Sequence, residues 1–328
     1  MPTATGTIPV IDVAAFLAGR PGALAATAKQ LGQALEQVGF FQIVNHGVDW
    51  EQVEGIYAAA AAYHALPLDQ KLPQQMSAKS MGYSPWQGQV RGAKPSLNSA
   101  YFLARPTSSR NQWPDEADLA GFRATVSAYY EIMDQLCGRL LELYSVAAGM
   151  LADHFGQYFQ PSLATLRLSH YPSVAAEVDQ WGIDPHSDAG FMTLLPANPV
   201  AGLWIRPPGA EWFEPAQERE SFVVNSGDML RRWTNHRFLS TTHRVLNVSG
   251  QDRYAMPFFF DPRVDSIIEC LPSCCDEANP ARHPPITYRD YLVPFMQRSY
   301  VAVLGTAGAD AKGGFAGPAS LGGLKQGE

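Results

Sequence analysis

The chain has 328 residues, of which 46% are hydrophobic and 17% are charged, the proportions of a globular protein that buries a sizeable core. A net charge of -7 without any run of Lys and Arg argues against nucleic acid as a partner. No apolar stretch approaches the roughly 20 residues that span a bilayer, and the start of the chain shows no basic leader. We therefore expect a cytoplasmic monomer without a membrane partner.

The first part of the chain, residues 1–115, alternates between helical and strand-like patterns. Gly39 is suited to end a helix, and Pro67 stops the next one. The expected elements are a strand leading into a helix over 8–17, a helix over 23–39, a strand over 40–48 and a helix over 51–66. These patterns predict an N-terminal α/β region dominated by helices.

The middle of the chain combines an irregular segment with a long helix. Residues 81–106 carry Gly, Pro and polar residues between aromatic ones, which favours a loop with short strands. Residues 117–156 show the longest helical pattern in the chain. The region 116–160 is therefore expected to supply the main supporting helix.

Short strand-like runs separated by turn residues dominate the region 161–303. They are found at 164–172, 191–197, 202–209, 212–216, 221–230, 242–250 and 253–262. This spacing predicts a β-sandwich or barrel, closed by a helix over 287–301 and followed by a flexible Gly- and Ala-rich tail at 304–328. The expected fold is mainly β with flanking helices, one structural unit in which the N-terminal helical layer backs the β core.

Two ligand-type side chains stand together at the entrance to one apolar run. In "DPHSDAGFMTLL", His186 and Asp188 are two residues apart and share one side of an extended segment. Among the other histidines His243 stands out, because its strand-like run places it on one face with Thr241 and Val245. Two imidazoles and one carboxylate leave about three open positions on an octahedral iron, which dioxygen and a chelating co-substrate can fill.

A cation is predicted to face the same interior. Arg253 opens the otherwise apolar strand "RYAMPFFF", and its planar guanidinium matches a carboxylate, such as the far end of a 2-oxo diacid. Each feature taken alone also has a structural explanation. His and Asp often meet at turns, His243 fits a hydrogen-bonded strand histidine, and Arg253 fits a surface ion pair. The order and spacing of all three features favour the metal site.

The four cysteines do not indicate a second metal site. Cys137 stands alone, and Cys270, Cys274 and Cys275 contain no CxxC pair with a suitably spaced His. We expect ordinary reduced thiols.

The ordered set of motifs resembles the iron(II) and 2-oxoglutarate-dependent dioxygenases of the isopenicillin N synthase-like superfamily. The resemblance covers nearly the whole chain and rests on "IPVIDVAAFL", "GFFQIVNHGV", "LRLSHYP", "HSDAGFMTLL", "VVNSGDMLRRWTN", "STTHRV" and "RYAMPFFFDP". It implies a distorted double-stranded β-helix, or jelly roll, flanked by helices.

The motifs of this family fall on particular residues of the chain. The resemblance implies three iron(II) ligands and two residues that bind 2-oxoglutarate, which are His186, Asp188, His243, Arg253 and Tyr171. Asn225 and His46 match family motifs as well, and we interpret both as structural residues.

Two positions depart from the family pattern. Where the family usually has Arg-x-Ser, this chain has Arg253, Tyr254 and Ala255, and Ser169 stands where many members carry Asn. The missing hydroxyl at Ala255 removes a donor worth on the order of 1 kcal/mol. The contact at Ser169 is expected to be missing or bridged by water. Both departures weaken the expectation for the co-substrate more than that for the metal.

The resemblance implies an oxidoreductase, a dioxygenase that uses iron(II), 2-oxoglutarate and dioxygen and releases succinate and carbon dioxide. Through an iron(IV)-oxo intermediate it would hydroxylate, desaturate or cyclise a small organic substrate, as in secondary metabolism. One alternative is an oxidase like isopenicillin N synthase, which uses no 2-oxoglutarate, so that Arg253 would hold a substrate carboxylate. A zinc hydrolase accepts the same ligands but lacks a general base at motif-like spacing, and a silent binding protein would be expected to lose a ligand.

Substrate contacts are expected from the irregular segment and from the core strands. The candidates in the irregular segment are Tyr83, Trp86, Arg91, Tyr101 and Phe102. Phe258 and Phe260 are expected to share the pocket face with Arg253 if the strand continues past Pro257, although a core role fits them as well.

Overall fold

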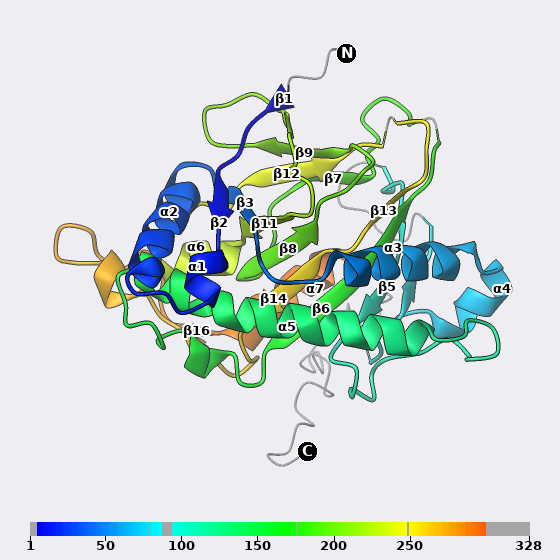
Figure 1. The fold of residues 1–328 in the computed structure, drawn as a ribbon, viewed down its shortest axis with the longest axis horizontal. Helices are drawn as coiled ribbons and strands as arrows, with labels where there is room; N and C mark the ends of the chain where they lie inside the picture. Colours follow the sequence, from blue (N-terminus) through cyan, green and yellow to red (C-terminus); the bar gives the residue numbers. More distant parts are fainter. Residues whose placement is uncertain (1–4, 78, 87–93, 175, 248, 300–328) are drawn as a thin grey trace, which may run out of the picture.

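The computed structural model describes residues 5–77, 79–86, 94–174, 176–247 and 249–299. Within these residues helices cover one side of a large β-sheet, and a smaller sheet stands beside the large one (Figure 1). The mainly β architecture with an N-terminal helical layer, predicted from the sequence, is confirmed.

The N-terminal region forms short strands and helices. Gly39, with a φ of 72°, adopts the left-handed conformation in the tight connection between the second helix and the third strand. Asp49 caps the next long helix by accepting a hydrogen bond from the Glu51 amide at 3.1 Å. The elements are β1 (Thr5–Gly6), β2 (Val10–Asp12), α1 (Ala14–Leu17), α2 (Ala23–Gln37), β3 (Phe40–Val44), α3 (Trp50–Ala65), α4 (Leu68–Lys71), the 3-10 helix η1 (Leu72–Gln74), β4 (Tyr83–Ser84) and β5 (Ser99–Leu103).

The supporting helix α5 (Phe122–Ala147) lies within the range predicted for it and runs along the molecule in front of the large sheet (Figure 1). Its buried face contributes tyrosine and leucine side chains to the main core, and it packs against α2 and α3. The Tyr130 hydroxyl donates to the Ala164 carbonyl at 3.0 Å, which ties the helix to a central strand. The helix therefore fixes the back of the sheet that carries the site.

In the described part of the chain the large sheet has nine strands, in the order β2-β3-β11-β8-β14-β6-β5-β4, with β13 also paired to β6. Strand β6 pairs with two successive segments, because Met256 and Pro257 separate β13 from β14 and proline supplies no amide hydrogen. The strands that complete this sheet are β6 (Leu163–Tyr171), β8 (Met192–Pro196), β11 (Phe222–Ser226), β13 (Arg253–Ala255) and β14 (Phe258–Asp261).

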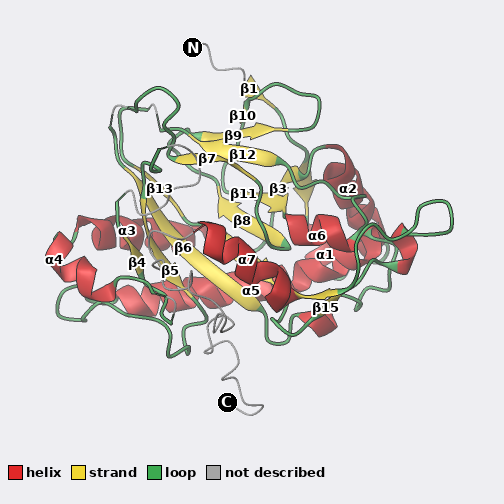
Figure 2. Cartoon of the chain, turned by 180° about the vertical axis from the view of Figure 1, so that it is seen from behind, coloured by secondary structure: helices red, strands yellow, loops and turns green. Residues whose placement is uncertain are grey.

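The small sheet has the order β7-β12-β9 and lies next to β8 and β11 in both views (Figures 1 and 2). The predicted closing helix appears as α7, and the predicted tail at 304–328 lies outside the described residues. The remaining elements are β7 (Ile183–His186), β9 (Leu203–Arg206), β10 (Glu214–Pro215), β12 (Thr242–Val245), β15 (Ile267–Ile268), β16 (Ile286–Thr287), α6 (Asp228–Trp233), α7 (Tyr288–Ser299) and the 3-10 helices η2 (Gly156–Tyr158) and η3 (Pro272–Cys274).

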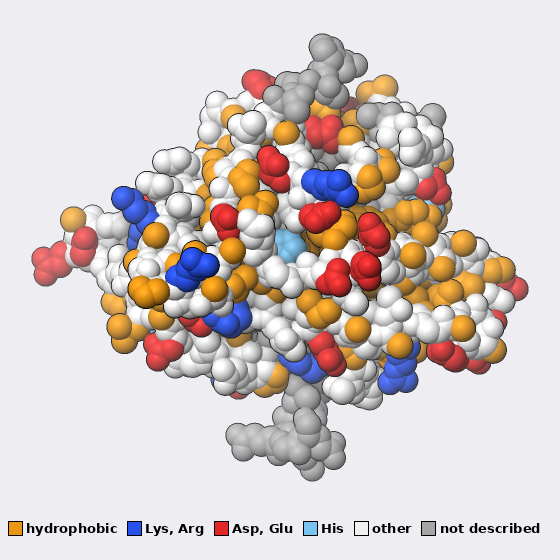
Figure 3. Space-filling view, viewed as in Figure 1, with side chains coloured by type: hydrophobic (Ala, Val, Ile, Leu, Met, Phe, Trp, Pro, Cys, Tyr) orange, Lys and Arg blue, Asp and Glu red, His pale blue; other side chains and the backbone are white. Residues whose placement is uncertain are grey.

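The surface agrees with the acidic composition. On the face shown in Figure 3, Asp and Glu side chains are spread among apolar and neutral ones, and the described residues of this face form no extended patch of Lys and Arg. None of the described helices combines the length and the apolar character that crossing a bilayer requires.

Candidate metal centre

Three side chains named from the sequence converge between the two sheets. Strands β7 and β12 pair antiparallel with His186 directly opposite His243, and the centroids of the two imidazole rings are 4.2 Å apart. Asp188 lies two residues beyond the end of β7 and turns back toward them. Its Oδ1 atom is 3.8 Å from Nε2 of His186 and 3.7 Å from Nε2 of His243. One ligand atom from each residue falls within 4.8 Å of the others, which is close enough for all three to hold one ion.

Backbone carbonyls orient the two imidazoles. Nδ1 of His186 lies 2.7 Å from the Asp184 carbonyl oxygen, and Nδ1 of His243 lies 3.2 Å from the Thr241 carbonyl oxygen. Because a carbonyl only accepts, each Nδ1 carries the proton and each Nε2 carries a lone pair. Both lone pairs therefore point toward the carboxylate of Asp188, the arrangement that a metal ion requires.

The carboxylate of Asp188 is held in place by two donors. The Thr193 hydroxyl and the Asn225 amide donate to its Oδ2 atom at 2.7 and 2.8 Å, which leaves Oδ1 toward the histidines. Burial acts to raise the pKa of Asp188, but the positive charge of either imidazole when it is protonated and these two hydrogen bonds outweigh burial and lower that pKa below its ordinary value. Asp188 is thus ionised at neutral pH, as a metal ligand must be.

The turn that follows Asp188 is clamped by backbone contacts. The Asp228 amide donates to the Asp188 carbonyl at 2.7 Å, and the Gly227 amide donates to the Phe191 carbonyl at 3.1 Å. A Cβ atom at Gly227 would lie 2.3 Å from the Gly190 carbonyl oxygen, so no larger residue fits without moving this turn. The Asp261 carboxyl accepts from the Phe191 amide at 2.7 Å on the other side. The position of Asp188 is therefore determined by β11, α6 and β14 together.

A buried arginine and a tyrosine lie across the same pocket. Strands β13 and β6 pair Arg253 with Tyr171, and the guanidinium carbon lies 5.3 Å from the centroid of the tyrosine ring. Arg253 is 1% exposed, and its Nε donates to the Val200 carbonyl at 3.1 Å. Its Nη1 is buried and has no hydrogen-bond partner among the described residues. A buried guanidinium with an unpaired N–H group is suited to an anionic ligand.

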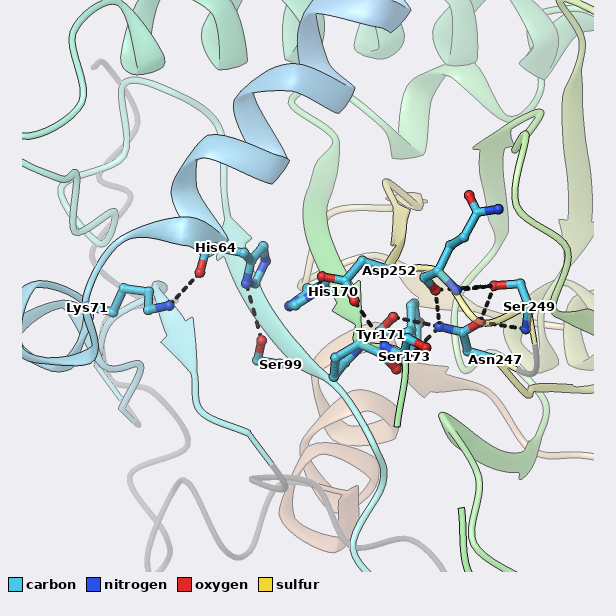
Figure 4. A network of polar contacts seen from close by, with 11 residues as sticks. His64, Lys71, Ser99, His170, Tyr171, Ser173, Asn247, Ser249 and Asp252 are labelled. Atoms are coloured by element: carbon cyan, nitrogen blue, oxygen red, sulfur yellow. Dashed lines mark hydrogen bonds and ion pairs between the residues drawn. The ribbon is translucent and has the colours of Figure 1, made fainter. Parts of the chain in front are cut away.

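A polar network outside the pocket fixes the register of this pair (Figure 4). The carboxylate of Asp252, the residue before Arg253, lies 3.0 Å from Nε2 of His170 and accepts from the Ser173 amide at 2.9 Å. The Asn247 amide donates to the carbonyl of Tyr171 at 2.8 Å. These bonds join the end of β6 to the start of β13, so Tyr171 and Arg253 are held side by side.

The two departures from the family pattern face each other across the same strands. Ser169 pairs with Ala255, and alternation along β6 places Ser169 on the face that carries Tyr171. Ser169 is fully buried, and its hydroxyl has no hydrogen-bond partner among the described residues. A hydroxyl group is therefore present on the strand that neighbours the alanine.

Most of the residues predicted to contact substrate lie elsewhere. Tyr83 and Tyr101 are 3% and 0% exposed and belong to the main core, and their role as substrate contacts stays a prediction. On that face, Tyr63 of α3 and Phe122 of α5 pack against the ring of Tyr101. Phe102 packs with Met76 and has a guanidinium over its ring, whereas Trp86 is 39% exposed. Arg91 lies outside the described residues.

Phe258 and Phe260 take the core role that the sequence had left open beside a pocket role. Both side chains are buried in the main core, where they contact aromatic rings of Tyr130 and Phe159. Alternation through the Pro257 interruption instead directs every second residue to the pocket, which is lined by Arg253, Ala255, Pro257 and Phe259.

Sequence reasoning missed Thr193 and Arg167 among the residues that line the pocket. The signal for Arg167 was present, because it stands four residues before Tyr171 in a strand and therefore shares its face. Asn225 and His46 were interpreted as structural residues. Asn225 supports Asp188, and Nε2 of His46 lies 3.0 Å from the Glu220 carbonyl oxygen. The four cysteines are free thiols.

Comparison with known proteins agrees with this geometry. Residues 162–262 match the 2OG-Fe(II) oxygenase superfamily, and residues 8–116 match the family described as non-haem dioxygenase in morphine synthesis N-terminal. A 2-oxoglutarate-Fe(II) type oxidoreductase of Emericella nidulans is 31% identical over 314 residues, which cover 89% of this chain and 90% of that protein. The chain belongs to the 2OG-Fe(II) oxygenase superfamily.

Solved structures give the same result. Full-length T7H of Neurospora crassa in complex with alpha-KG (2-oxoglutarate) has a TM-score of 0.82 at 28% identity and covers 88% of this chain and 95% of its own. JOX2 in complex with 2OG, Fe and JA has a TM-score of 0.76 at 28% identity and covers 88% of this chain and 85% of its own. The jelly-roll core and the iron(II)- and 2-oxoglutarate-dependent oxidoreductase predicted from the sequence are confirmed. The oxidase alternative is not favoured, because these neighbours hold 2-oxoglutarate.

Proposed function

We propose that His186, Asp188 and His243 bind the iron(II) of this oxygenase and that Arg253 binds the far carboxylate of 2-oxoglutarate. The observation that carries the proposal is the convergence of two Nε2 lone pairs on the Oδ1 atom of one ionised carboxylate, beside a buried guanidinium. Two neutral imidazoles and one carboxylate on one side of the ion are the ligand set of non-haem iron(II) oxygenases. The residues present therefore fit the metal.

Ser169 and Tyr171 complete the co-substrate site. The Ser169 hydroxyl and Nη1 of Arg253, which both lack a hydrogen-bond partner among the described residues, lie on paired strands, where one carboxylate would accept hydrogen bonds from both. The Tyr171 ring lies against the guanidinium and keeps it pointing along the pocket. Ser169 thus supplies from β6 the hydroxyl that Ala255 lacks on β13.

The protein's part in the reaction is positioning and exclusion of water. Iron(II) bound with 2-oxoglutarate supplies the activation of dioxygen that oxidises a substrate C–H bond and releases succinate and carbon dioxide. Apolar side chains from both sheets line the remaining wall, which keeps water from the reacting atoms; they include Phe40, Ile183, Leu195, Leu203 and Phe259. Thr193 and Asn225 keep the iron-binding carboxylate in one orientation.

The test is the weak visible charge-transfer band of iron(II) chelated by 2-oxoglutarate, recorded anaerobically on the purified full chain. His243→Ala is expected to abolish the band. Arg253→Leu is expected to weaken 2-oxoglutarate binding about 100-fold, because it removes a charge-assisted pair, and Ser169→Ala about 5- to 10-fold.

Matched controls lie outside the pocket. His283→Ala removes a histidine whose ring lies 5.0 Å from that of His236, and Arg105→Leu removes an arginine that pairs with Asp134 of α5 at 3.2 Å. Both control variants are expected to keep the wild-type band. If Arg253→Leu and Ser169→Ala bind 2-oxoglutarate as the wild type does, the co-substrate assignment fails. If iron binds without giving the band, the oxidase alternative regains support.

The proposal extends to a cytoplasmic monomer of secondary metabolism that acts on a small molecule, without a nucleic acid or membrane partner. It is supported by the net charge of -7 and by the small ligands in the neighbours' structures, thymine and JA. Size-exclusion chromatography with light scattering tests the monomer, and a dimer would contradict it.

A further inference from the structure

We propose that Phe40 is a positioning residue for the imidazole of His243 and holds it where His243 and Asp188 bind one metal ion together. This inference rests on the proposed function, because it concerns the same ligand set. It gives the N-terminal region, which supplies none of the three proposed ligands, a role in the metal centre.

The proposed ligands are supported by two different sheets. His186 and His243 belong to β7 and β12 of the small sheet. The carboxylate of Asp188 instead accepts hydrogen bonds from Thr193 of β8 and Asn225 of β11, which are strands of the large sheet. The distance of 3.7 Å between Oδ1 of Asp188 and Nε2 of His243 therefore depends in part on how the two sheets pack against each other.

Phe40 makes a contact between these sheets. It is the first residue of β3 in the large sheet, is 1% exposed and lines the pocket. Its ring packs edge-to-face with the imidazole of His243, with the ring centroids 5.4 Å apart and the ring planes at 72°. Strands β3 and β11 pair Phe40 directly with Asn225, and the side chains of such a pair point to the same side of the sheet. Neighbouring positions of the large sheet thus contact His243 through Phe40 and Asp188 through Asn225.

The hydrogen bond that orients His243 is longer than the one that orients His186. Nδ1 of His243 lies 3.2 Å from the Thr241 carbonyl oxygen, at the long end of the range for such bonds. Nδ1 of His186 lies 2.7 Å from the Asp184 carbonyl oxygen. The bond that joins an imidazole to its Cβ atom rotates over a broad range, so one long hydrogen bond fixes the ring only loosely. The ring of Phe40 limits this rotation for His243.

The turn before Phe40 is bonded to the segment that leads into β12. The Thr241 hydroxyl donates to the Val38 carbonyl, and the Thr241 carbonyl is the group that orients His243. A Cβ atom at Gly39 would lie 2.6 Å from Oγ1 of Thr241, so the two segments are in close contact. Phe40 is therefore held at a fixed place relative to the imidazole that it contacts.

The experiment records proton NMR spectra of the full chain loaded with cobalt(II), a paramagnetic substitute for iron(II) that shifts the resonances of its ligands. Two shifted resonances that exchange with solvent are expected, one from the Nδ1 proton of each imidazole. Phe40→Leu and Phe40→Met keep an apolar side chain but remove the ring, and each is expected to move one of the two resonances. Both variants are also expected to weaken iron(II) binding by about 10-fold in an anaerobic titration.

Phe41→Leu is the matched control. Phe41 follows Phe40 on β3, is fully buried and belongs to the main core, on the other face of the strand. Its replacement removes a buried ring of the same kind without touching a proposed ligand. We expect this variant to keep both resonances in place and to bind iron(II) within about twofold of the wild type.

The wild type tests the proposed function separately. If the wild type binds no iron(II) and shows no shifted resonances, the assignment of the ligands fails. If it binds the metal, the inference on Phe40 fails when the Phe40 variants keep both resonances and the wild-type affinity. It also fails when Phe41→Leu weakens iron(II) binding as much, or when the Phe40 variants move both resonances, because either result would mean a general loosening of the fold.

Discussion

Asp261 offers a quantitative test of how the turn after Asp188 is supported. Its carboxyl is partly buried against Gly190, in the turn that follows Asp188, and accepts a hydrogen bond from the Phe191 amide at 2.7 Å. Burial, opposed by this hydrogen bond and aided by the negative charge of Asp188, raises the pKa of Asp261 from 3.8 to about 7. The folded protein therefore carries a protonated Asp261 under mildly acidic conditions, whereas the unfolded chain carries an ionised one.

The size of the effect follows from linkage. Because the folded state binds the extra proton, this carboxyl makes the protein less stable as the pH rises from about 4 to about 7. Each pH unit between about 4 and 7 lowers the free energy of unfolding by up to 1.36 kcal/mol. The decrease between pH 5 and pH 7 is therefore about 2.5 kcal/mol. Asp261→Asn keeps the acceptor for the Phe191 amide, has no proton to lose and removes this dependence.

The assay is urea-induced unfolding of the wild type and Asp261→Asn, both metal-free, at pH 5, 6, 7 and 8. The other titrating groups cancel in the difference between the two proteins, so the stability of the variant relative to the wild type is expected to rise by about 2.5 kcal/mol from pH 5 to pH 7. Parallel pH profiles would refute the reasoning, since they would mean that Asp261 has the same pKa in both states. A difference of opposite sign would mean that the folded protein holds it ionised.

Three other substitutions test how Asp188 is supported and how burial affects His64. Gly227→Ala places a Cβ atom 2.3 Å from the Gly190 carbonyl oxygen and is expected to weaken iron binding about 10-fold or more in an anaerobic titration. An affinity equal to that of the wild type would show that the turn can move without disturbing the iron ligands. Thr193→Val removes one of the two donors to Asp188 and is expected to weaken iron binding by about 10-fold, while an unchanged affinity would contradict its supporting role. Burial lowers the pKa of His64 to about 3, so its neutral form is needed for folding and lowering the pH from 7 to 5 is expected to remove about 2 kcal/mol of stability. The His64→Gln variant is expected to keep this stability at pH 5. If denaturant unfolding showed the same acid sensitivity in both proteins, His64 would not be the source of the lost stability.

The candidate metal site was predictable because part of its signal is local. His186 and Asp188 are two residues apart, so a short extended segment suffices to bring them together. The sequence could not show that Asp188 lies beyond the end of β7, nor that His243 pairs directly with His186. That pairing depends on which strands become neighbours, and the intervening chain forms β8, β9 and β11 before returning. The resemblance to a known family supplied what local patterns do not contain.

The substrate residues were harder to predict. The alternation of side chains along a strand identifies two faces, but it does not show which face is covered by helices and which faces the pocket. Tyr101 and Phe102 are adjacent on β5 and point to opposite sides, one into the core beneath α3 and α5 and one toward Arg167. Aromatic content alone favoured both. A buried Arg in an apolar strand is more informative, because a guanidinium inside a protein requires a partner that an aromatic ring does not.

The two departures from the family pattern illustrate how strand pairing changes the meaning of a substitution. Taken one at a time along the chain, Ala255 and Ser169 are two losses from the co-substrate site. The register of β13 and β6 makes them opposite neighbours, whose Cβ atoms in such a pair are about 5 Å apart. A hydroxyl on either residue would therefore lie on the strand pair that carries Tyr171 and Arg253, within about 5 Å of the other position. When relatives are compared, the hydrogen-bond donors at these two paired positions should therefore be counted together. In this chain the pair offers one buried hydroxyl, that of Ser169, which has no partner among the described residues.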